Sequence, residues 1–227
     1  MSKGIFITAT GTDVGKTYVT ALLVKKLRES GFNAGYYKAA LSGAEVTQSG
    51  LVPGDAAYVN EIAQLQEEPQ KLVSYIYENA VSPHLAAQIE GNPVELDVVK
   101  SDYEEICRRY DYVVVEGSGG IVCPIRFDET NRIFLEDIIK MLDLDTIIVA
   151  DAGLGTINAV ALTVEYLVER NIKIRGIIFN HFHPENVMEE DNKNMVEEIT
   201  GVPVIAVVQD NEESLAINQE ELSKIFR

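Results

Sequence analysis

Short apolar runs alternate with amphipathic segments along most of the chain. Continuous apolar runs predict buried strands at Ile5–Ala9, Asn33–Lys38, Tyr112–Glu116, Thr146–Ala150, Ile174–Asn180 and Val204–Val208, of which the second is the weakest. Apolar residues at helical spacing predict helices over Thr17–Ser30, Asp97–Arg109, Phe134–Leu142, Thr156–Arg170 and Asn192–Thr200. This alternation indicates an α/β fold, with a mostly parallel sheet covered by helices on both faces.

No repeat, low-complexity tract or linker divides the sequence, so we expect a single domain over residues 1–227. Gly43–Gly54 is rich in glycine and serine, and we interpret it as a functional loop. In a parallel sheet, ligands bind beyond the carboxyl ends of the strands. The residues expected there are Thr10-Gly11-Thr12, Lys38, Glu116-Gly117-Ser118, Asp151, Asn180 and Gln209.

The strongest chemical signal is Gly11-Thr12-Asp13-Val14-Gly15-Lys16-Thr17, which follows an apolar strand and opens a helix. Glycine lets a backbone curl so that N–H groups and the helix N-terminus face an anion. In such a phosphate-binding loop, Lys16 reaches the β- and γ-phosphates and Thr17 ligates Mg²⁺. The strict pattern has glycine where this chain has Thr10, so the loop is a variant. The alternative is an ordinary strand-to-helix turn.

A second signal is the apolar strand that ends in Glu116. A carboxylate at that position can ligate Mg²⁺ directly or through water, and the alternative is a solvated strand end. Gly117-Ser118-Gly119-Gly120 follows and offers exposed N–H donors, or forms a plain turn.

Lys38 and Asp55 are candidates that spacing alone leaves open. Lys38 at the end of its strand could stabilise developing negative charge, or it could be a snorkelling surface lysine. Asp55 could cap a helix or ligate a metal.

Several other segments carry weaker signals. Gly153–Asn158 opens a helix whose N-terminus could hold a carboxylate, but Asn158 stands where a dinucleotide fingerprint needs glycine. His181 and His183 have no third metal ligand nearby, so we interpret them as loop residues. Cys123 is expected to be a packing residue without a lowered pKa. The pairs Glu189-Glu190, Glu212-Glu213 and Glu220-Glu221 are interpreted as solvated helix faces.

Composition narrows the class of protein. Lys plus Arg number 19 against 36 Asp plus Glu, a formal net charge of −17 that disfavours nucleic acid as a partner. Only two cysteines, Cys107 and Cys123, are present and they are far apart, which fits a reducing cytoplasm. The apolar stretch among the first residues is too short for a signal peptide. No apolar run approaches the roughly 20 residues of a membrane span. We therefore expect a cytoplasmic protein with no membrane partner.

Taken together, these segments resemble the dethiobiotin synthetase family, over nearly the whole chain. The resemblance rests on Thr10–Thr17, Tyr37–Gly43, Gly54–Ala56, Ser82-Pro83-His84, Val115–Gly120 and Gly155–Asn158 in this order. The family's phosphate-binding loop has the same spacing, with its first small residue at the position of Ala9. This chain departs from the family where it has Ala9 in place of glycine, Ala39 in place of proline and Gln209 in place of proline.

The resemblance implies a P-loop NTPase-like fold and an ATP- and Mg²⁺-dependent ring closure of 7,8-diaminononanoate with CO₂. It implies catalytic roles for Thr12, Lys16 and Lys38, and Mg²⁺ ligation by Thr17, Asp55 and Glu116. It implies ATP contacts from Asp13, Val14, Gly15, Lys16, Thr17, Tyr18, Asp55, Glu116, Gly117, Ser118, Gly119, Asn180, His181 and Gln209. Thr12 and Ser42 would hold the substrate head. In the family the substrate crosses a homodimer interface, so Gly155, Thr156 and Asn158 of a second subunit would receive its carboxylate.

Two other functions are compatible with such a fold. One is a related P-loop amide-forming ligase, but those usually carry a glutamine-hydrolysing domain with a catalytic cysteine, and neither cysteine here has that context. The other is a partitioning or division-site switch ATPase, which has a signature lysine where this chain has Gly11.

Overall fold

The computed structural model describes residues 2–48 and 50–226. Its centre is a seven-stranded sheet in the order β11-β10-β9-β1-β6-β2-β5, and every neighbouring pair is parallel. The strands are β1 (Lys3–Ala9), β2 (Ala34–Ser42), β5 (Val73–Tyr77), β6 (Tyr112–Glu116), β9 (Asp145–Asp151), β10 (Ile174–Asn180) and β11 (Val204–Val207). The predicted mostly parallel sheet is therefore confirmed.

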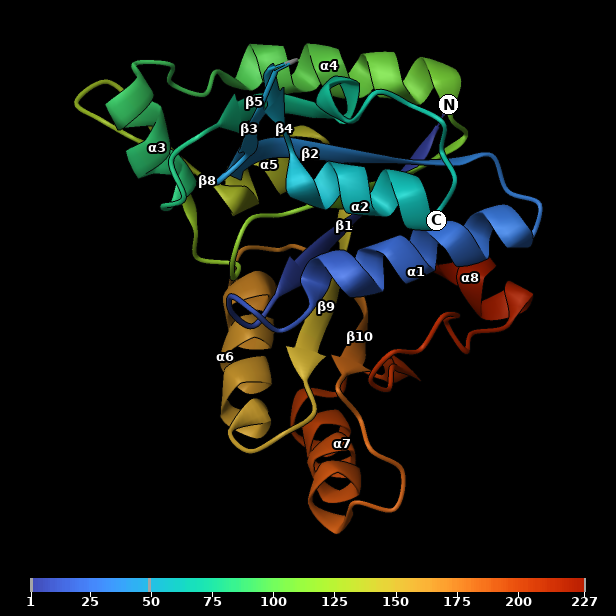
Figure 1. Cartoon of the computed structure of the whole chain (residues 1–227). Coiled ribbons are helices and arrows are strands. Elements are labelled where there is room, and N and C mark those ends of the chain that lie inside the picture. Colours follow the sequence, from blue (N-terminus) through green and yellow to red (C-terminus); the bar gives the residue numbers. More distant parts are fainter. Residues whose placement is uncertain (1, 49, 227) are drawn as a thin grey trace.

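Helices pack against the sheet, as Figure 1 shows, with α1 and α2 side by side on one face and α4 on the opposite one. The helices are α1 (Lys16–Glu29), α2 (Gly54–Ile62), α3 (Pro83–Glu90), α4 (Leu96–Arg109), α5 (Leu135–Met141), α6 (Thr156–Glu169), α7 (Val187–Thr200) and α8 (Gln219–Ile225), with a 3₁₀ turn η1 (Pro69–Leu72). The chain leaves β1 toward β2 on one side and later returns to β9 on the other. Such a switch point beside β1 opens a crevice at the carboxyl ends of the strands.

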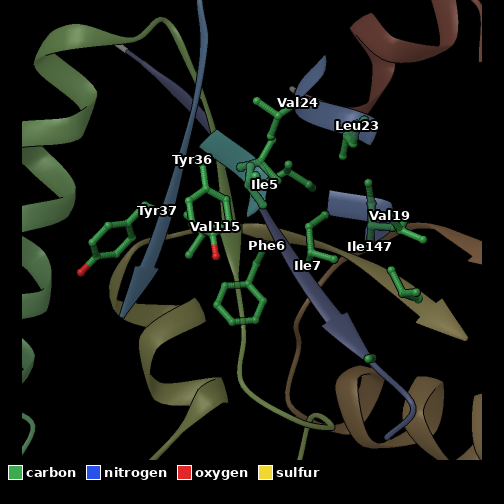
Figure 2. Packing of buried hydrophobic residues seen from close by; sticks show 14 of the residues in the cluster. Ile5, Phe6, Ile7, Val19, Leu23, Val24, Tyr36, Tyr37, Val115 and Ile147 are labelled. Atoms are coloured by element: carbon green, nitrogen blue, oxygen red, sulfur yellow. The ribbon is translucent and has the colours of Figure 1, made fainter. Parts of the chain in front are cut away.

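The core is built around β1, which lies in the middle of the sheet. Figure 2 shows Ile5, Phe6 and Ile7 among apolar side chains from α1 and the neighbouring strands. Each of these three residues is at most 1% exposed. Burial on both faces explains why β1 has a continuous apolar sequence rather than an alternating one.

One strand extends further than its sequence predicts. We expected the second strand to end at Lys38, but β2 runs on to Ser42. The extra residues pair with β5, from Lys38 opposite Val73 to Ser42 opposite Tyr77. β5 itself was not predicted, because five residues with alternating burial give a weak signal. Lys38 therefore lies within the sheet, and Ser42 is at the strand's carboxyl end.

The segment between β2 and α4 is more ordered than the sequence indicates. Gly43–Gly54, interpreted as a loop, contains a hairpin of β3 (Glu45–Thr47) and β4 (Gly50–Val52). The unpredicted helices α2 and α3 follow it. A second unpredicted hairpin joins β7 (Pro124–Phe127) to β8 (Arg132–Phe134).

Some acidic residues were placed wrongly. Helix α7 begins before the predicted Asn192, because the Asn186 side chain caps it by accepting from the Met188 N–H. Glu189 in its first turn is buried, and it accepts from the His183 N–H at 2.5 Å instead of facing solvent. Glu212 and Glu213 lie in the segment after β11, outside any helix.

The tight approach of β2 to Tyr110 gives a test of the packing. A Cβ on Gly35 would lie 2.3 Å from the Tyr110 ring, which is pinned by its hydroxyl bond to Glu67 at 2.9 Å. We expect Gly35→Ala to lower the free energy of unfolding by about 1–3 kcal/mol. Gly54→Ala, where a Cβ meets open space, should change it by less than about 0.5 kcal/mol. Urea denaturation of both variants measures this, and equal midpoints would contradict the packing described.

Candidate active site

A cavity of about 710 Å³ opens at the carboxyl ends of β1, β2 and β6. Its lining residues are Gly11, Thr12, Asp13, Gly15, Lys16, Thr17, Lys38, Leu41, Ser42, Asp55, Ala80, Val81, Ser82, Pro83, Ser118, Gly119 and Cys123. Ten of the residues singled out for catalysis, ligand binding or metal binding in the sequence are in that set, which brings together segments far apart along the chain.

The loop between β1 and α1 has the backbone shape of an anion site. Gly15, at the start of α1, has φ +79° and Asp13 has φ +61°, so two residues of the loop are in the left-handed region. No side chain caps α1, which leaves the first N–H groups of the helix available. Free N–H groups and the positive end of the helix dipole together favour bound phosphate.

Asn180 supports this loop from β10. Its Nδ2 donates to the Val14 carbonyl oxygen at 3.1 Å. A Cβ on Gly15 would lie 2.0 Å from the same nitrogen, so glycine is required there for two reasons. Asn180 Oδ1 is buried and has no hydrogen-bond partner among the described residues.

The centre of the site is the carboxylate of Glu116, which is 1% exposed. Three donors converge on Oε1: Lys16 Nζ at 3.0 Å, Lys38 Nζ at 2.9 Å and Thr17 Oγ1 at 2.8 Å. The Tyr36 hydroxyl donates to the other oxygen, Oε2, at 3.0 Å. Glu116, at the end of β6, thus links this strand to both β2 and α1.

The charges in this cluster stabilise one another. Burial by itself raises the pKa of Glu116, but the Lys38 and Lys16 charges outweigh it and lower that pKa to about 2. Burial also works against the charge on Lys38, yet Glu116 and Asp55 together raise the pKa of Lys38. For Lys16, burial is the larger effect and its pKa is lowered, with Glu116 offsetting part of the change. Lys38 is the more firmly charged lysine because it has two carboxylate partners.

Asp55 comes from the first turn of α2 and faces the cavity. Its Oδ2 lies 2.6 Å from Lys38 Nζ, and its side chain is 37% exposed. With the Thr17 hydroxyl and the Glu116 carboxylate it forms a set of hard oxygen donors. Mg²⁺ is typically held by one or two carboxylates together with phosphate oxygens and water, so these residues fit it. Among the described residues, no group of three or more His, Cys, Asp or Glu could hold a metal without such help.

One wall of the cavity was not identified by local patterns. Ala80–Pro83 precede and begin α3, and Cys123 follows the glycine-rich loop. Burial raises the pKa of Cys123 to about 11, in line with the expectation that it is not an activated thiol. Ser118 ties its loop to β2 by donating to the Ala40 carbonyl oxygen at 2.8 Å.

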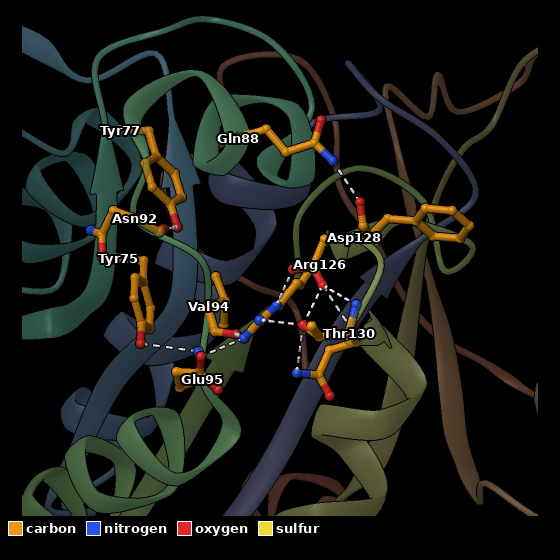
Figure 3. Close-up of polar contacts among 11 residues, drawn as sticks. Tyr75, Tyr77, Gln88, Asn92, Val94, Glu95, Arg126, Asp128 and Thr130 are labelled. Carbon is orange, nitrogen blue, oxygen red and sulfur yellow. Dashed lines mark hydrogen bonds and ion pairs between the residues drawn. The ribbon is translucent and has the colours of Figure 1, made fainter.

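A buried arginine, Arg126, lies in the hairpin that follows Cys123. Figure 3 shows Arg126 of β7 bonded to the Val94 carbonyl oxygen, Asp128 and Thr130, and ion-paired with Glu95. These bonds connect the hairpin after the glycine-rich loop to the start of α4. No sequence motif marks Arg126, because two of its partners, Val94 and Glu95, come from a separate segment.

Some of the residues that the resemblance assigns to ATP contacts, namely Tyr18, His181 and Gln209, are not among those that line the cavity. Gln209 follows β11, and its N–H donates to Glu212 Oε2 at 2.8 Å. Tyr18 on α1 donates to the Glu212 carbonyl oxygen, which ties this segment to the helix. His181 Nδ1 lies 2.7 Å from Asp151 Oδ2 at the ends of β10 and β9. His183 interacts with Glu189 and Asp210, so the two histidines have different side-chain partners.

The predicted carboxylate site at the start of α6 is separate from the cavity of its own chain. Gly155 has φ +94° at the helix N-cap, and no side chain caps the helix. Thr156 is buried, and its Oγ1 has no hydrogen-bond partner among the residues that the structure describes. Leu154, two residues before Thr156, is 92% exposed. Asn158 lies in the first turn and is exposed.

Known proteins resemble the chain along its whole length. Residues 3–217 match the family model described as an AAA domain. A relative from Brachyspira hyodysenteriae (strain ATCC 49526 / WA1), described as ATP-dependent dethiobiotin synthetase BioD, is 52% identical over 227 residues that cover 100% of both chains. A relative of the same description from Clostridium botulinum (strain Eklund 17B / Type B) is 47% identical over 226 residues, covering 100% of this chain and 99% of its own.

Solved structures with low sequence identity share the fold. The MinC:MinD cell division protein complex of Aquifex aeolicus has a TM-score of 0.58 at 16% identity, covering 93% of this chain and 83% of that one. A ParA family ATPase from Chlorobium tepidum has a TM-score of 0.56 at 15% identity, covering 98% and 90%. The predicted P-loop NTPase-like fold is therefore confirmed. Across residues 2–48 and 50–226, no helix combines the length and apolar character needed to cross a bilayer.

The raised pKa of Cys123 predicts how this thiol reacts. In a Cys107→Ser variant, iodoacetamide should modify Cys123 with a rate that still increases with pH through pH 10, because the thiolate forms only near its pKa of about 11. At pH 8 the rate should be about tenfold below that of the unfolded chain. Mass spectrometry of timed samples measures both rates. A native rate that levels off near pH 9 would show that the thiol is not buried as described.

Proposed function

The chain belongs to the ATP-dependent dethiobiotin synthetase family, and from that premise we propose that it forms dethiobiotin from 7,8-diaminononanoate, CO₂ and ATP. The observation that carries the proposal is the convergence of Lys16, Lys38 and Glu116 beneath a phosphate-binding loop. ADP and phosphate are the other products. One P-loop domain over residues 1–227 would perform all the steps.

The proposed reaction has three steps. One substrate amine adds to CO₂ and loses a proton, giving a carbamate. A carbamate oxygen attacks the γ-phosphorus of ATP, the bond to the β-phosphate oxygen breaks, and a carbamic–phosphoric anhydride and ADP result. The second amine attacks the carbamoyl carbon, loses its proton and expels phosphate, which closes the five-membered ureido ring.

The lysines would stabilise the charge that moves in the second step. Lys16 extends from the first turn of α1 and Lys38 from β2, so their ammonium groups reach the cavity from two elements. We propose that they hold the γ-phosphate and carbamate oxygens, with Thr12 and Ser42 at the cavity wall holding the two amines of the substrate. Preorganised positive charge and fixed orientation are the main sources of catalysis in such a transfer.

We propose that Thr17, Asp55 and Glu116 hold Mg²⁺. When bound, the metal supplies positive charge to the phosphate oxygens. The residues themselves contribute a hydroxyl, a buried carboxylate and a half-exposed carboxylate around one side of the cavity.

Around the nucleotide we propose backbone and side-chain contacts from three segments. Asp13–Tyr18 would enclose the phosphates, and Gly117–Gly119 would add N–H donors. Asn180 would accept from the adenine amino group, because its Oδ1 has no other partner among the described residues. His181 and Gln209 would complete the base site, in which Gln209 replaces the family's proline.

We also propose that the enzyme is a cytoplasmic homodimer whose substrate site crosses the interface. The start of α6, with Gly155, Thr156 and Asn158, would then receive the substrate carboxylate of the other subunit. The uncapped N-terminus and the unpartnered Thr156 hydroxyl suit an anion. Exposed Leu154 and Leu162 beside it are apolar groups that a second copy could cover.

Coupled phosphate release tests the function. Release from Mg²⁺ and ATP should require diaminononanoate and bicarbonate together, and mass spectrometry should find one dethiobiotin per phosphate. Phosphate release at the same rate with and without diaminononanoate and bicarbonate would overturn the proposal. It would favour a switch ATPase on the same fold.

We predict that Lys38→Met lowers kcat by about 100-fold or more while ATP affinity changes little, because the lysine stabilises charge in the transfer step. Glu116 retains Lys16, Thr17 and Tyr36 as partners, so the variant should fold. Lys71→Met is the control, since Lys71 is exposed and pairs only with Glu68 among the described residues. Steady-state kinetics and nucleotide titration give both values, and an unchanged kcat would remove Lys38 from the mechanism.

For the dimer, sedimentation equilibrium should give about 50 kDa, twice the chain mass of 25.1 kDa. Leu162→Glu on α6 should produce monomers that bind ATP but do not turn over diaminononanoate. Val98→Glu, on the exposed side of α4, should leave the dimer intact. A wild-type monomer that is fully active would contradict the shared site.

A further inference from the structure

Tyr36 and Lys38 project from the same face of β2 toward Glu116. In the register of the sheet, Tyr36 pairs with Val114 and Lys38 pairs with Glu116 on the adjacent strand β6. Residues two apart on a strand share a face, so the phenol and the ammonium group approach one carboxylate side by side. Tyr36 is fully buried and does not line the cavity.

The two carboxylate oxygens of Glu116 have different partners. Lys16, Lys38 and Thr17 all bond to Oε1. Among the described residues, only the Tyr36 hydroxyl bonds to Oε2. Without that donor, a buried carboxylate oxygen would be unpaired, and rotation of the group toward the lysines would relieve this.

We propose that Tyr36 is a positioning residue that fixes the carboxylate plane of Glu116, so that Oε1 alone meets Lys16, Thr17 and Lys38, which line the cavity. It acts through Glu116 and touches neither nucleotide nor substrate. The inference rests on the proposed function of Glu116 as a metal ligand. With the carboxylate fixed, a divalent cation bound with the nucleotide would meet Oε1 in one orientation, and Lys16 and Lys38 would stay on one side of the carboxylate.

The next residue along the strand provides a matched control. Tyr37 is also buried, but its hydroxyl donates to the Val99 carbonyl oxygen at 2.9 Å and shares a hydrogen bond of 2.6 Å with Ser74. Figure 2 shows the Tyr36 and Tyr37 rings on opposite sides of β2. Removing either hydroxyl disturbs one buried donor on the same strand, and only one of the two changes touches Glu116.

The experiment compares Tyr36→Phe with Tyr37→Phe. Electron paramagnetic resonance measures Mn²⁺ binding to each protein in the presence of ADP, and urea denaturation measures stability. Tyr36→Phe should weaken Mn²⁺ binding by about tenfold or more, the usual effect of removing a group that orients a metal ligand. Tyr37→Phe should change it by less than about twofold, with a similar loss of stability. Wild-type affinity in Tyr36→Phe, or equal losses in both variants, would overturn the proposal.

A second measurement keeps the hydroxyl in place. With 3-fluorotyrosine at position 36, Mn²⁺ affinity should stay at the wild-type value, and the ¹⁹F resonance should shift when Mg²⁺ is added to the ADP-bound protein. With 3-fluorotyrosine at position 37, the resonance should not move. A silent resonance at position 36 would contradict the coupling even if Tyr36→Phe failed to fold.

These readouts separate the inference from the function on which it rests. Absence of dethiobiotin from the wild-type enzyme would reject the proposed reaction. Metal binding with ADP needs no substrate amine, so unchanged binding in Tyr36→Phe would reject the role of Tyr36 alone.

Discussion

The structure of the site depends on one buried carboxylate. Glu116 accepts from two ammonium groups and a hydroxyl on a single oxygen, and from a phenol on the other. Removing one partner of a buried ion pair costs about 3–5 kcal/mol when the remaining charge is left uncompensated. The four donors come from the start of α1 and from β2, so Glu116 on β6 fixes the positions of both elements relative to the phosphate-binding loop. The same contacts keep Lys16 and Lys38 close to each other, although their like charges repel.

The parallel sheet places this carboxylate where a nucleotide can use it. β6 lies between β1 and β2, so the loop after β1, the lysine of β2 and the end of β6 meet at one edge. Asn180 from β10 supports the loop from the other side, and its contact with Gly15 leaves no space for a side chain. The strands β1, β2 and β6 form the base of the cavity, whereas α2, α3 and the segment after β11 supply the groups around it. This division suits the proposed reaction, in which the enzyme holds the reacting phosphate and admits an extended diamine from outside.

Local sequence predicts the parts of the site that depend on local structure. The phosphate-binding loop follows from a strand, a glycine pattern and a helix, and Glu116 follows from an apolar strand that ends in a carboxylate. Lys38 was predicted to end its strand, because β5, which pairs with the rest of β2, has too short a pattern to identify. Tyr36 carries no local signal, since its partner Glu116 is distant in sequence. Arg126 bonds to Asp128 and Thr130 nearby, but its link to Val94 and Glu95 depends on a segment about 30 residues earlier. Glu189 was wrongly assigned to solvent because its hydrogen bond to the turn at His183 depends on how that turn folds.

The central claim is that the proposed enzyme, through the cluster of Lys16, Lys38 and Glu116, transfers the γ-phosphoryl group of ATP to a carbamate and not to water. The most direct test is turnover of diaminononanoate with ATP and ¹⁸O-labelled bicarbonate, stopped before the label exchanges with solvent. If a carbamate oxygen attacks phosphorus, the released phosphate will contain one ¹⁸O atom derived from CO₂, and mass spectrometry will detect it. Phosphate that contains no label while dethiobiotin accumulates would contradict the account.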